Sequence, residues 1–332
     1  MGQTHRVDSS AAARQSSNRD AVVVGAGPNG LAAAVRLAGS GRSVLVLEGA
    51  TEIGGGCRTA ELTLPGFQHD ICSAVHPTGI GSPFFAELPL GDHGLEWIHP
   101  DTPLAHPFDD GSAAVLERSL AETVAELGRD GATWRRLVGR SVARWDDLTS
   151  DALGPLVRIP RHPFLLASVG LPGVLPASVL VRAFREERTR ALFAGLAAHA
   201  ILPLTHPFTG VIGLTLGAAA HAVGWPVARG GSRAITDALA GIVTELGGSI
   251  ETGRTVKSMS DLPSASAYLF DVDPRQLTSI AGDRFPDRYR SRMARFPAGP
   301  LDSRLQSTLT RSFRYLKRPF IDLKTNTNFS CH

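Results

Sequence analysis

A short apolar strand, a glycine-rich turn and a helix follow one another near the start of the chain. Residues 20–24 read Asp-Ala-Val-Val-Val, and residues 25–30 read Gly-Ala-Gly-Pro-Asn-Gly. Gly25 suits a tight exit from a buried strand, Gly27 a close backbone approach to a pyrophosphate, and Gly30 close packing of the helix on the sheet. This order predicts the first half of a dinucleotide-binding βαβ unit.

The residues after these glycines extend the same prediction. Pro28 and Asn29 fall in the first turn of the predicted helix, where unpaired N–H groups and the helix dipole favour a phosphate. A second apolar strand at 43–47 ends in Glu48, where such units carry a carboxylate for the ribose hydroxyls. A carboxylate at this position also disfavours a 2′-phosphate. We therefore expect these residues to bind the cofactor.

A second glycine cluster follows the second strand. Residues 54–59 read Gly-Gly-Gly-Cys-Arg-Thr. This string resembles the equivalent segment of a large flavoprotein group that includes amine oxidases and phytoene desaturases. In that group the loop lies along FAD and its arginine contacts the cofactor. The resemblance implies that Gly55, Gly56, Arg58 and Thr59 bind FAD, although Gly56 stands where the group often has a first arginine.

Two further stretches, 64–77 and 224–232, are similar to the bacterial phytoene-desaturase-like branch of that group. The resemblance runs from about residue 20 to about residue 300. It implies an α/β fold, a glutathione-reductase-like FAD/NAD(P)-binding Rossmann domain interrupted by a mostly helical substrate domain. It also implies that Val256 touches adenine through backbone atoms and that residues 229–232 lie near flavin and substrate.

The predicted organisation has five parts. Residues 1–19 are polar and are expected to form a disordered extension. Residues 20–95 and 230–300 are assigned to the FAD-binding domain, 96–229 to the substrate domain, and 301–332 to an atypical basic tail.

The tail contains no glycine and carries six Lys or Arg against two Asp, a net charge of +4, whereas the whole chain carries +3. The resembled family closes with a glycine-rich segment that returns to the flavin. We therefore expect the tail to result from a frameshift or truncation of a longer reading frame, with a true alternative C-terminus as the other possibility. In either case we expect an incomplete flavin site.

Local patterns predict further helices and strands. Ser119 and Glu122 form a capping box that opens a helix to Leu127. Ser232 is predicted to cap the helix that follows it. The remaining predicted elements are helices at 131–150, 233–246 and 274–281 and strands at 249–256 and 268–272. The strand at 249–256 is expected to rejoin the first domain.

Two stretches without Lys, Arg, Asp or Glu dominate the middle of the chain, 162–181 and 191–228. Prolines interrupt both, and His199, His206 and His221 would be costly in lipid. We expect buried helices that line an apolar substrate cavity, with the histidines hydrogen-bonded in the core. A membrane-facing surface is the alternative, and spanning helices are the least favoured reading.

Composition, cysteine spacing and charge disfavour several classes of function. The chain is 43% hydrophobic and 20% charged, which is ordinary for a globular protein. Cys57, Cys72 and Cys331 form no CxxC pair, which disfavours a disulfide reductase and fits a reduced cytoplasm, with Cys57 as a buried filler. Without its basic tail the chain is nearly neutral, so no nucleic-acid partner is expected. The predicted location is cytoplasmic, with possible peripheral membrane contact and an undetermined oligomeric state.

The expected function is FAD-dependent oxidation, a dehydrogenation or desaturation of an apolar small molecule by hydride transfer to flavin. The sequence has no catalytic triad or metal-ligand spacing, so we predict no metal and assign no catalytic residue. His69, Asp70 and His76 could approach the flavin ring, although Asp70 is equally suited to a structural acceptor role. An NAD-linked dehydrogenase and a non-enzymatic dinucleotide-binding fragment are the alternatives.

Overall fold

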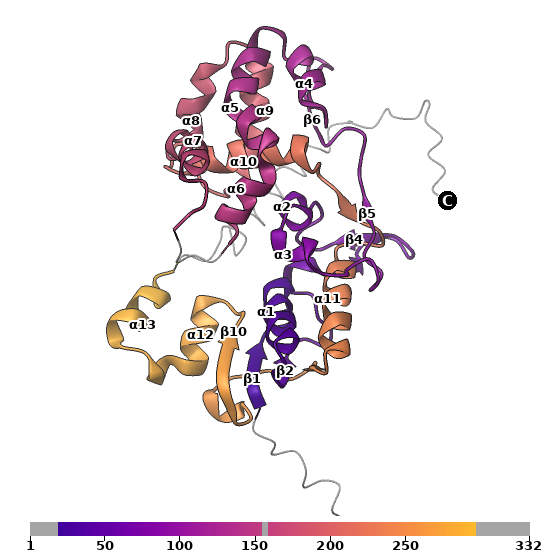
Figure 1. Cartoon of the computed structure of the whole chain (residues 1–332), viewed down its shortest axis with the longest axis vertical. Coiled ribbons are helices and arrows are strands. Elements are labelled where there is room, and N and C mark those ends of the chain that lie inside the picture. Colours follow the sequence, from indigo (N-terminus) through magenta and orange to yellow (C-terminus); the bar gives the residue numbers. More distant parts are fainter. Residues whose placement is uncertain (1–18, 155–158, 297–332) are drawn as a thin grey trace, which may run out of the picture.

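Four parallel strands form the central sheet of one of two lobes (Figure 1). The computed structural model describes residues 19–154 and 159–296. The strands β1 (Arg19–Val24), β2 (Val44–Leu47), β9 (Ser249–Glu251) and β10 (Ala265–Phe270) lie in the order β10-β1-β2-β9. Val22 of β1 lies between Leu45 of β2 and Tyr268 of β10. The short, fully apolar β2 is buried throughout, as expected for an inner strand of a parallel sheet.

Helices cover one face of this sheet. α1 (Pro28–Gly39) and α11 (Arg233–Glu245) pack together against it through Leu31, Val35 and Leu239. The other face is covered by partly buried apolar side chains from the segment around β10. α12 (Pro274–Ala281) and α13 (Asp287–Ala294) follow β10 beside the sheet (Figure 1). The predicted α/β class and the βαβ unit are confirmed, and β9 rejoins the sheet as expected, although it ends at Glu251.

Several short elements connect the two lobes or, at residues 104–116, belong to the second lobe, whose core includes Ala114 and Leu116. They are the hairpin β3 (Thr59–Glu61) and β4 (Gln68–Asp70), the turn η2 (Gly55–Cys57), the helices α2 (Pro77–Ile80) and α3 (Pro83–Ala86), and the pairs β5 (Trp97–Ile98) with β8 (Val227–Ala228) and β6 (Leu104–Pro107) with β7 (Ala113–Leu116). The β5–β8 pair lies where the chain enters and leaves the second lobe.

The second lobe is a helical bundle. Its helices are α4 (Leu120–Glu126), α5 (Gly131–Ala143), α6 (Trp145–Ala152), α7 (Pro163–Gly173), α8 (Ala177–Leu180), α9 (Glu187–Ala198) and α10 (Thr209–Ala222). α10 runs through the middle of the bundle (Figure 1). Gly213 and Gly217 of α10 face Phe193 and Trp134, and a Cβ on Gly213 would come within 2.9 Å of the Phe193 ring. These small residues allow the aromatic side chains to pack directly on the helix backbone.

The structure corrects the helix predicted at 131–150. It breaks at Arg144, whose φ of −131° and ψ of 41° are not helical. Asp146 and Asp147 fall in the first turn of α6, where carboxylates stabilise a new helix N-terminus. One half of the predicted capping box of α4 is present, since the Ser119 hydroxyl accepts a hydrogen bond from the Glu122 amide.

The core role predicted for three histidines holds for His221 alone. His221 is buried and accepts a hydrogen bond from the Trp134 indole at 3.0 Å. His199 and His206 are exposed, because both belong to the connection that leaves the bundle between α9 and α10. The predicted extension at 1–19, apart from Arg19, and the predicted tail at 301–332 lie outside the described residues.

Candidate dinucleotide-binding site

A cavity of about 1040 Å³ opens at the carboxyl ends of β1, β2 and β10. β1 has β2 on one side and β10 on the other, and the connections of these strands diverge at that point. Such a divergence at the carboxyl edge of a parallel sheet is where open α/β folds bind ligands. The volume is that of a ligand site rather than of a packing defect.

The cavity brings together most of the residues that the sequence predicts. The predicted residues that line it are Gly25, Gly27, Pro28, Asn29, Glu48, Gly55, Gly56, Arg58 and Val256. Gly30 and Thr59 are not part of its lining, and neither are the residues at 229–232. Arg229 instead pairs with Glu96 at 2.6 Å.

Three glycines shape the turn after β1. Gly25 has a φ of +105°, a conformation that side chains rarely adopt. A Cβ on Gly30 would lie 2.1 Å from the Gly25 carbonyl oxygen, so Gly30 permits close contact between α1 and the turn. A Cβ on Gly55 would lie 2.9 Å from the Gly27 Cα. The two glycine-rich segments therefore meet backbone to backbone at the cavity wall.

Some backbone amides of this turn donate hydrogen bonds within the protein, and others have no acceptor among the described residues. Gly25 donates to the Leu47 carbonyl, Ala26 to the Glu48 carboxylate and Gly30 to the Asp271 carboxylate, while Pro28 has no N–H. The Gly27 and Asn29 amides have no acceptor among residues 19–154 and 159–296. They lie at the start of α1, where the helix dipole favours an anion.

Glu48 joins two loops of the site. One carboxylate oxygen accepts the Ala26 amide at 2.8 Å and the other accepts the Ala50 amide at 2.9 Å. Each carboxylate oxygen has a second lone pair, so these bonds leave acceptor capacity for ribose hydroxyls. The Glu48 backbone is bonded to Glu251 and Arg254, which continues the β2–β9 pairing into the cavity wall.

Charged side chains line the cavity on several sides. Arg58 is anchored by a bond of 3.0 Å from its Nε to the Gly55 carbonyl, and Arg254 and Lys257 add two further cations. The acidic Asp271 also lines the cavity and accepts the Gly30 amide at 2.8 Å. Sequence reasoning missed Asp271, although its position at the carboxyl end of the predicted strand is the signal that could have found it; that strand, β10, is only partly buried.

A buried network holds the second glycine segment against α11. Asp70 accepts bonds of 2.7 Å from the Thr59 hydroxyl and the Ser232 amide, which confirms the structural acceptor role considered for Asp70. His76 is bonded to the Ser232 hydroxyl at 2.8 Å, and burial lowers the pKa of His76. The predicted cap at Ser232 is wrong, because its hydroxyl also donates to the Ser73 carbonyl rather than accepting an α11 amide.

The two cysteines of this region differ in exposure. Cys57 is buried below the glycine segment, and burial raises the pKa of its thiol. Cys72 is exposed. The Cys57 side chain therefore fills a small buried space, as expected from the sequence.

Residues 23–88 match the family of NAD(P)-binding Rossmann-like domains. The rat protein "Pyridine nucleotide-disulfide oxidoreductase domain-containing protein 2" is 29% identical over 288 residues, covering 71% of this chain and 48% of that protein. A limonene dehydrogenase polypeptide of Castellaniella defragrans is 34% identical over 110 residues, 33% of this chain and 20% of that protein. The chain spans about half the length of the longer curated relatives that it matches.

Solved structures share the fold. The protein PF1083 from Pyrococcus furiosus has a TM-score of 0.56 at 21% identity, over 84% of this chain and 65% of that one. Cyclohexylamine oxidase from Brevibacterium oxydans has a TM-score of 0.52 at 19% identity, over 84% and 63%. Residues 23–88 therefore match a Rossmann-like dinucleotide-binding domain, and the chain as a whole shares its fold with these solved structures. The predicted resemblance to the amine oxidase type is confirmed at the level of the fold.

Proposed function

We propose that this chain binds FAD in the cavity at the carboxyl edge of its sheet and contributes to dehydrogenation of an apolar small molecule. One observation supports this most strongly. The Gly25–Gly30 turn, the Gly55–Arg58 segment and the Val256 region, far apart in the sequence, line a single cavity.

The residues of the cavity suit a dinucleotide. The free amides of Gly27 and Asn29 and the guanidinium of Arg58 suit the pyrophosphate. Glu48 suits the adenosine ribose, and the backbone at Val256 suits the adenine. When bound, the flavin supplies the hydride acceptor, and the protein supplies orientation and a shielded site.

The substrate class rests on a relative and on the composition of the second lobe. The Castellaniella limonene dehydrogenase acts, by its name, on an apolar terpene. The helical lobe has long uncharged stretches, which suit contact with an apolar molecule. A cytoplasmic location belongs to the same proposal.

Reconstitution tests this function. Purified protein is incubated with FAD, NAD⁺ or NADP⁺ and passed through a desalting column, and the retained cofactor is quantified. We expect retained flavin absorbance, and its bleaching on anaerobic addition of limonene would support the substrate class. Retention of NAD⁺ with no retention of FAD would overturn the flavin assignment in favour of an NAD-linked protein. Retention of neither would overturn both.

A further inference from the structure

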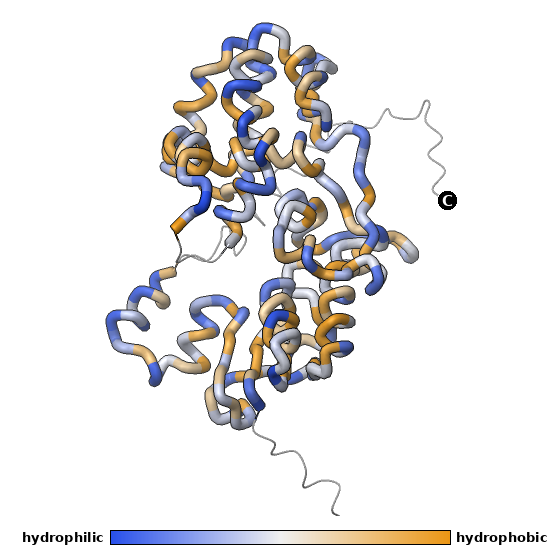
Figure 2. The backbone as a smooth tube through the Cα atoms, in the orientation of Figure 1, coloured by the Kyte–Doolittle hydropathy of each residue, from blue (hydrophilic) through white to orange (hydrophobic). Residues whose placement is uncertain are grey.

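Exposed apolar side chains gather at one edge of the helical lobe. They come from α7, α8 and the two segments that precede α7 and α10, and we call them the apolar face: Ile159, Phe164, Leu171, Val174, Leu175, Val179, Ile201, Leu202 and Phe208. Phe164 is 81% exposed and Leu171 is 74% exposed. In Figure 2 the α7 ribbon at the outer edge of this lobe is largely in the hydrophobic colour.

Backbone contacts make the face continuous. The Phe208 amide donates to the Val174 carbonyl at 3.0 Å, and the Ser178 amide donates to the Leu204 carbonyl at 3.0 Å. These bonds hold the segment before α10 against the turn between α7 and α8. The apolar residues of both segments therefore belong to one surface, and large exposed apolar surfaces commonly mark interaction sites.

Two residues of the face are held in strained conformations. Ile201 has a φ of +52° and Phe208 a φ of +68°. The left-handed region is unfavourable for bulky side chains and most of all for β-branched ones. Both side chains are more than half exposed. Packing contacts of these side chains within the lobe therefore do not offset the energetic cost of the left-handed conformation. Strained residues of this kind cluster at functional sites.

The charged residues within the segments that carry the face are arginines. Residues 159–185 contain Arg161, Arg182 and Arg185 and no Asp or Glu, and residues 199–208 contain no charged residue other than histidine. The three arginines are exposed, and the charge of Arg185 helps to lower the pKa of the nearby Asp130 carboxyl. An apolar surface bordered by cations is complementary to an anionic lipid headgroup layer.

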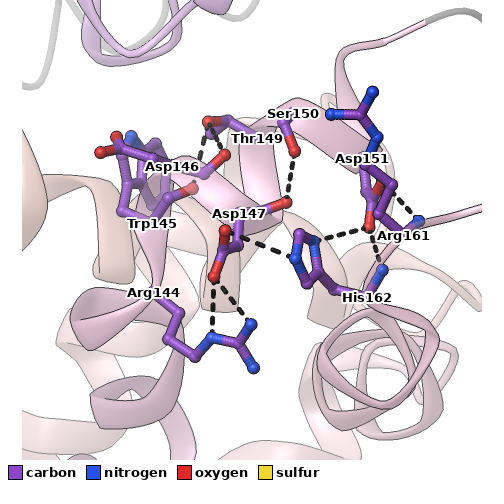
Figure 3. A network of polar contacts seen from close by, with 9 residues as sticks. All are labelled: Arg144, Trp145, Asp146, Asp147, Thr149, Ser150, Asp151, Arg161 and His162. Atoms are coloured by element: carbon purple, nitrogen blue, oxygen red, sulfur yellow. Dashed lines mark hydrogen bonds and ion pairs between the residues drawn. The ribbon is translucent and has the colours of Figure 1, made fainter.

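Two acidic residues of α6, Asp147 and Asp151, have polar partners (Figure 3). Asp147 binds Arg144 at 2.7 Å, and Asp151 accepts the His162 amide at 2.7 Å and lies 3.2 Å from the His162 ring. This network pairs Asp147 with Arg144 and gives Asp151 the backbone amides of Arg161 and His162 as donors. It also ties the start of α7 to α6, so that the apolar face is presented on a fixed helix.

The geometry of the helices favours a position on a bilayer surface. No single helix among the described residues is both long and apolar enough to cross a membrane, and α7 and the α8 segment, which pass such a test together, are bent by 87°. α7 alone is about 16 Å long. We propose that the apolar face docks this protein on the surface of an anionic lipid bilayer. This docking does not depend on flavin binding.

Vesicle flotation of the full chain tests the proposal. The probe is phosphatidylcholine vesicles containing about one third phosphatidylserine, with pure phosphatidylcholine vesicles in parallel. We expect the protein to float with the anionic vesicles and to remain below the pure phosphatidylcholine vesicles.

A pair of variants separates docking from folding. Asn tolerates the left-handed conformation, so Ile201→Asn with Phe208→Asn should keep or raise the melting temperature. The same variant should bind anionic vesicles about tenfold more weakly, because two apolar contacts are lost. Leu62→Asn with Leu64→Asn is the matched control, since both leucines are exposed on a different surface, and it should float like the parent.

Three results would overturn the proposal. They are absence of flotation with anionic vesicles, equal flotation of the parent and the Ile201→Asn/Phe208→Asn variant, and a concentration-dependent dimer of the parent that this variant abolishes. The last result would identify the face as a contact between two copies. Flavin retention is measured on the same samples, so that loss of docking is distinguished from failure of the FAD assignment.

Discussion

The Asp271 carboxylate accepts a hydrogen bond of 2.8 Å from the Gly30 amide, which lies 241 positions away in the chain. This bond joins the end of β10 to the first turn of α1. It also places a negative charge beside the amides that are free to bind a phosphate.

This hydrogen bond predicts different effects for two substitutions of Asp271, one on FAD binding and one on stability. Asp271→Asn keeps an acceptor for Gly30 and removes the charge, so we expect FAD to bind about threefold to tenfold more tightly. Asp271→Ala leaves the Gly30 amide unpaired, and we expect the free energy of unfolding to fall by about 1–3 kcal/mol. Fluorescence titration with FAD and chemical denaturation measure the two quantities. Weaker binding by Asp271→Asn would show that the carboxylate does not oppose the cofactor.

Glu48 combines a structural and a binding role. Because its oxygens hold the Ala26 and Ala50 amides, Glu48→Ala should lower both the free energy of unfolding and the free energy of FAD binding, each by about 1–3 kcal/mol. Glu52→Ala is the control, since Glu52 lines the same cavity but forms only an exposed ion pair with Arg233. A Glu48→Ala protein with the parent's FAD affinity would remove Glu48 from the ribose site.

Four histidines that are wholly or partly buried predict a loss of stability in mild acid. Burial lowers the pKa of His221, His76, His99 and His106 below 6.5 in the folded state. The unfolded chain therefore binds more protons than the folded chain as the pH falls through about 6.5. We expect the melting temperature to decline between pH 7.5 and pH 5.5, in the range of about one unit on either side of that pKa.

His221→Gln isolates one of these contributions. Glutamine does not titrate in this range, so the variant should lose less stability than the parent over the same pH interval. Its stability at pH 7.5 should be lower, because the bond from the Trp134 indole to His221 is perturbed. A parent protein whose melting temperature rises on acidification would contradict the prediction for the four histidines.

The sequence predicted the dinucleotide unit well because its signals are local. The alternation of an apolar strand, glycines that need special backbone positions, and a proline at the start of a helix arises within the first 50 residues. The starts of α11 and α12 were similarly visible from their flanking residues. These patterns depend on local backbone conformation and burial. Both are reflected in the types and spacing of residues within a short stretch of sequence.

The predictions that were wrong or missing concern residues whose role depends on contacts between distant segments of the chain. Ser232 has the residue type of a helix cap, but its hydroxyl is used by Ser73 and His76. Asp271 was missed because its partner, Gly30, is remote in the chain. Exposure of His199 and His206 likewise depends on where the connection between α9 and α10 leaves the bundle. Hydropathy marks that connection as apolar but does not show which side of it meets solvent.

The wall of the cavity supplies the most direct test of FAD binding. Gly27 has φ and ψ values that other residues adopt, but its Cβ would lie 3.0 Å from the Asp271 carboxylate and beside Gly55. A valine there would crowd the meeting point of the two glycine segments. Gly39→Ala is a matched control in the same helix, because its Cβ would make only an ordinary contact at 3.8 Å with Leu246.

Equilibrium dialysis with FAD compares the parent chain, Gly27→Val and Gly39→Ala at equal concentrations, with folding checked by circular dichroism. We predict saturable binding of FAD by the parent and by Gly39→Ala, and loss of binding by a folded Gly27→Val protein. Equal FAD affinity in all three proteins, or no binding by the folded parent, would contradict the placement of the cofactor in this cavity.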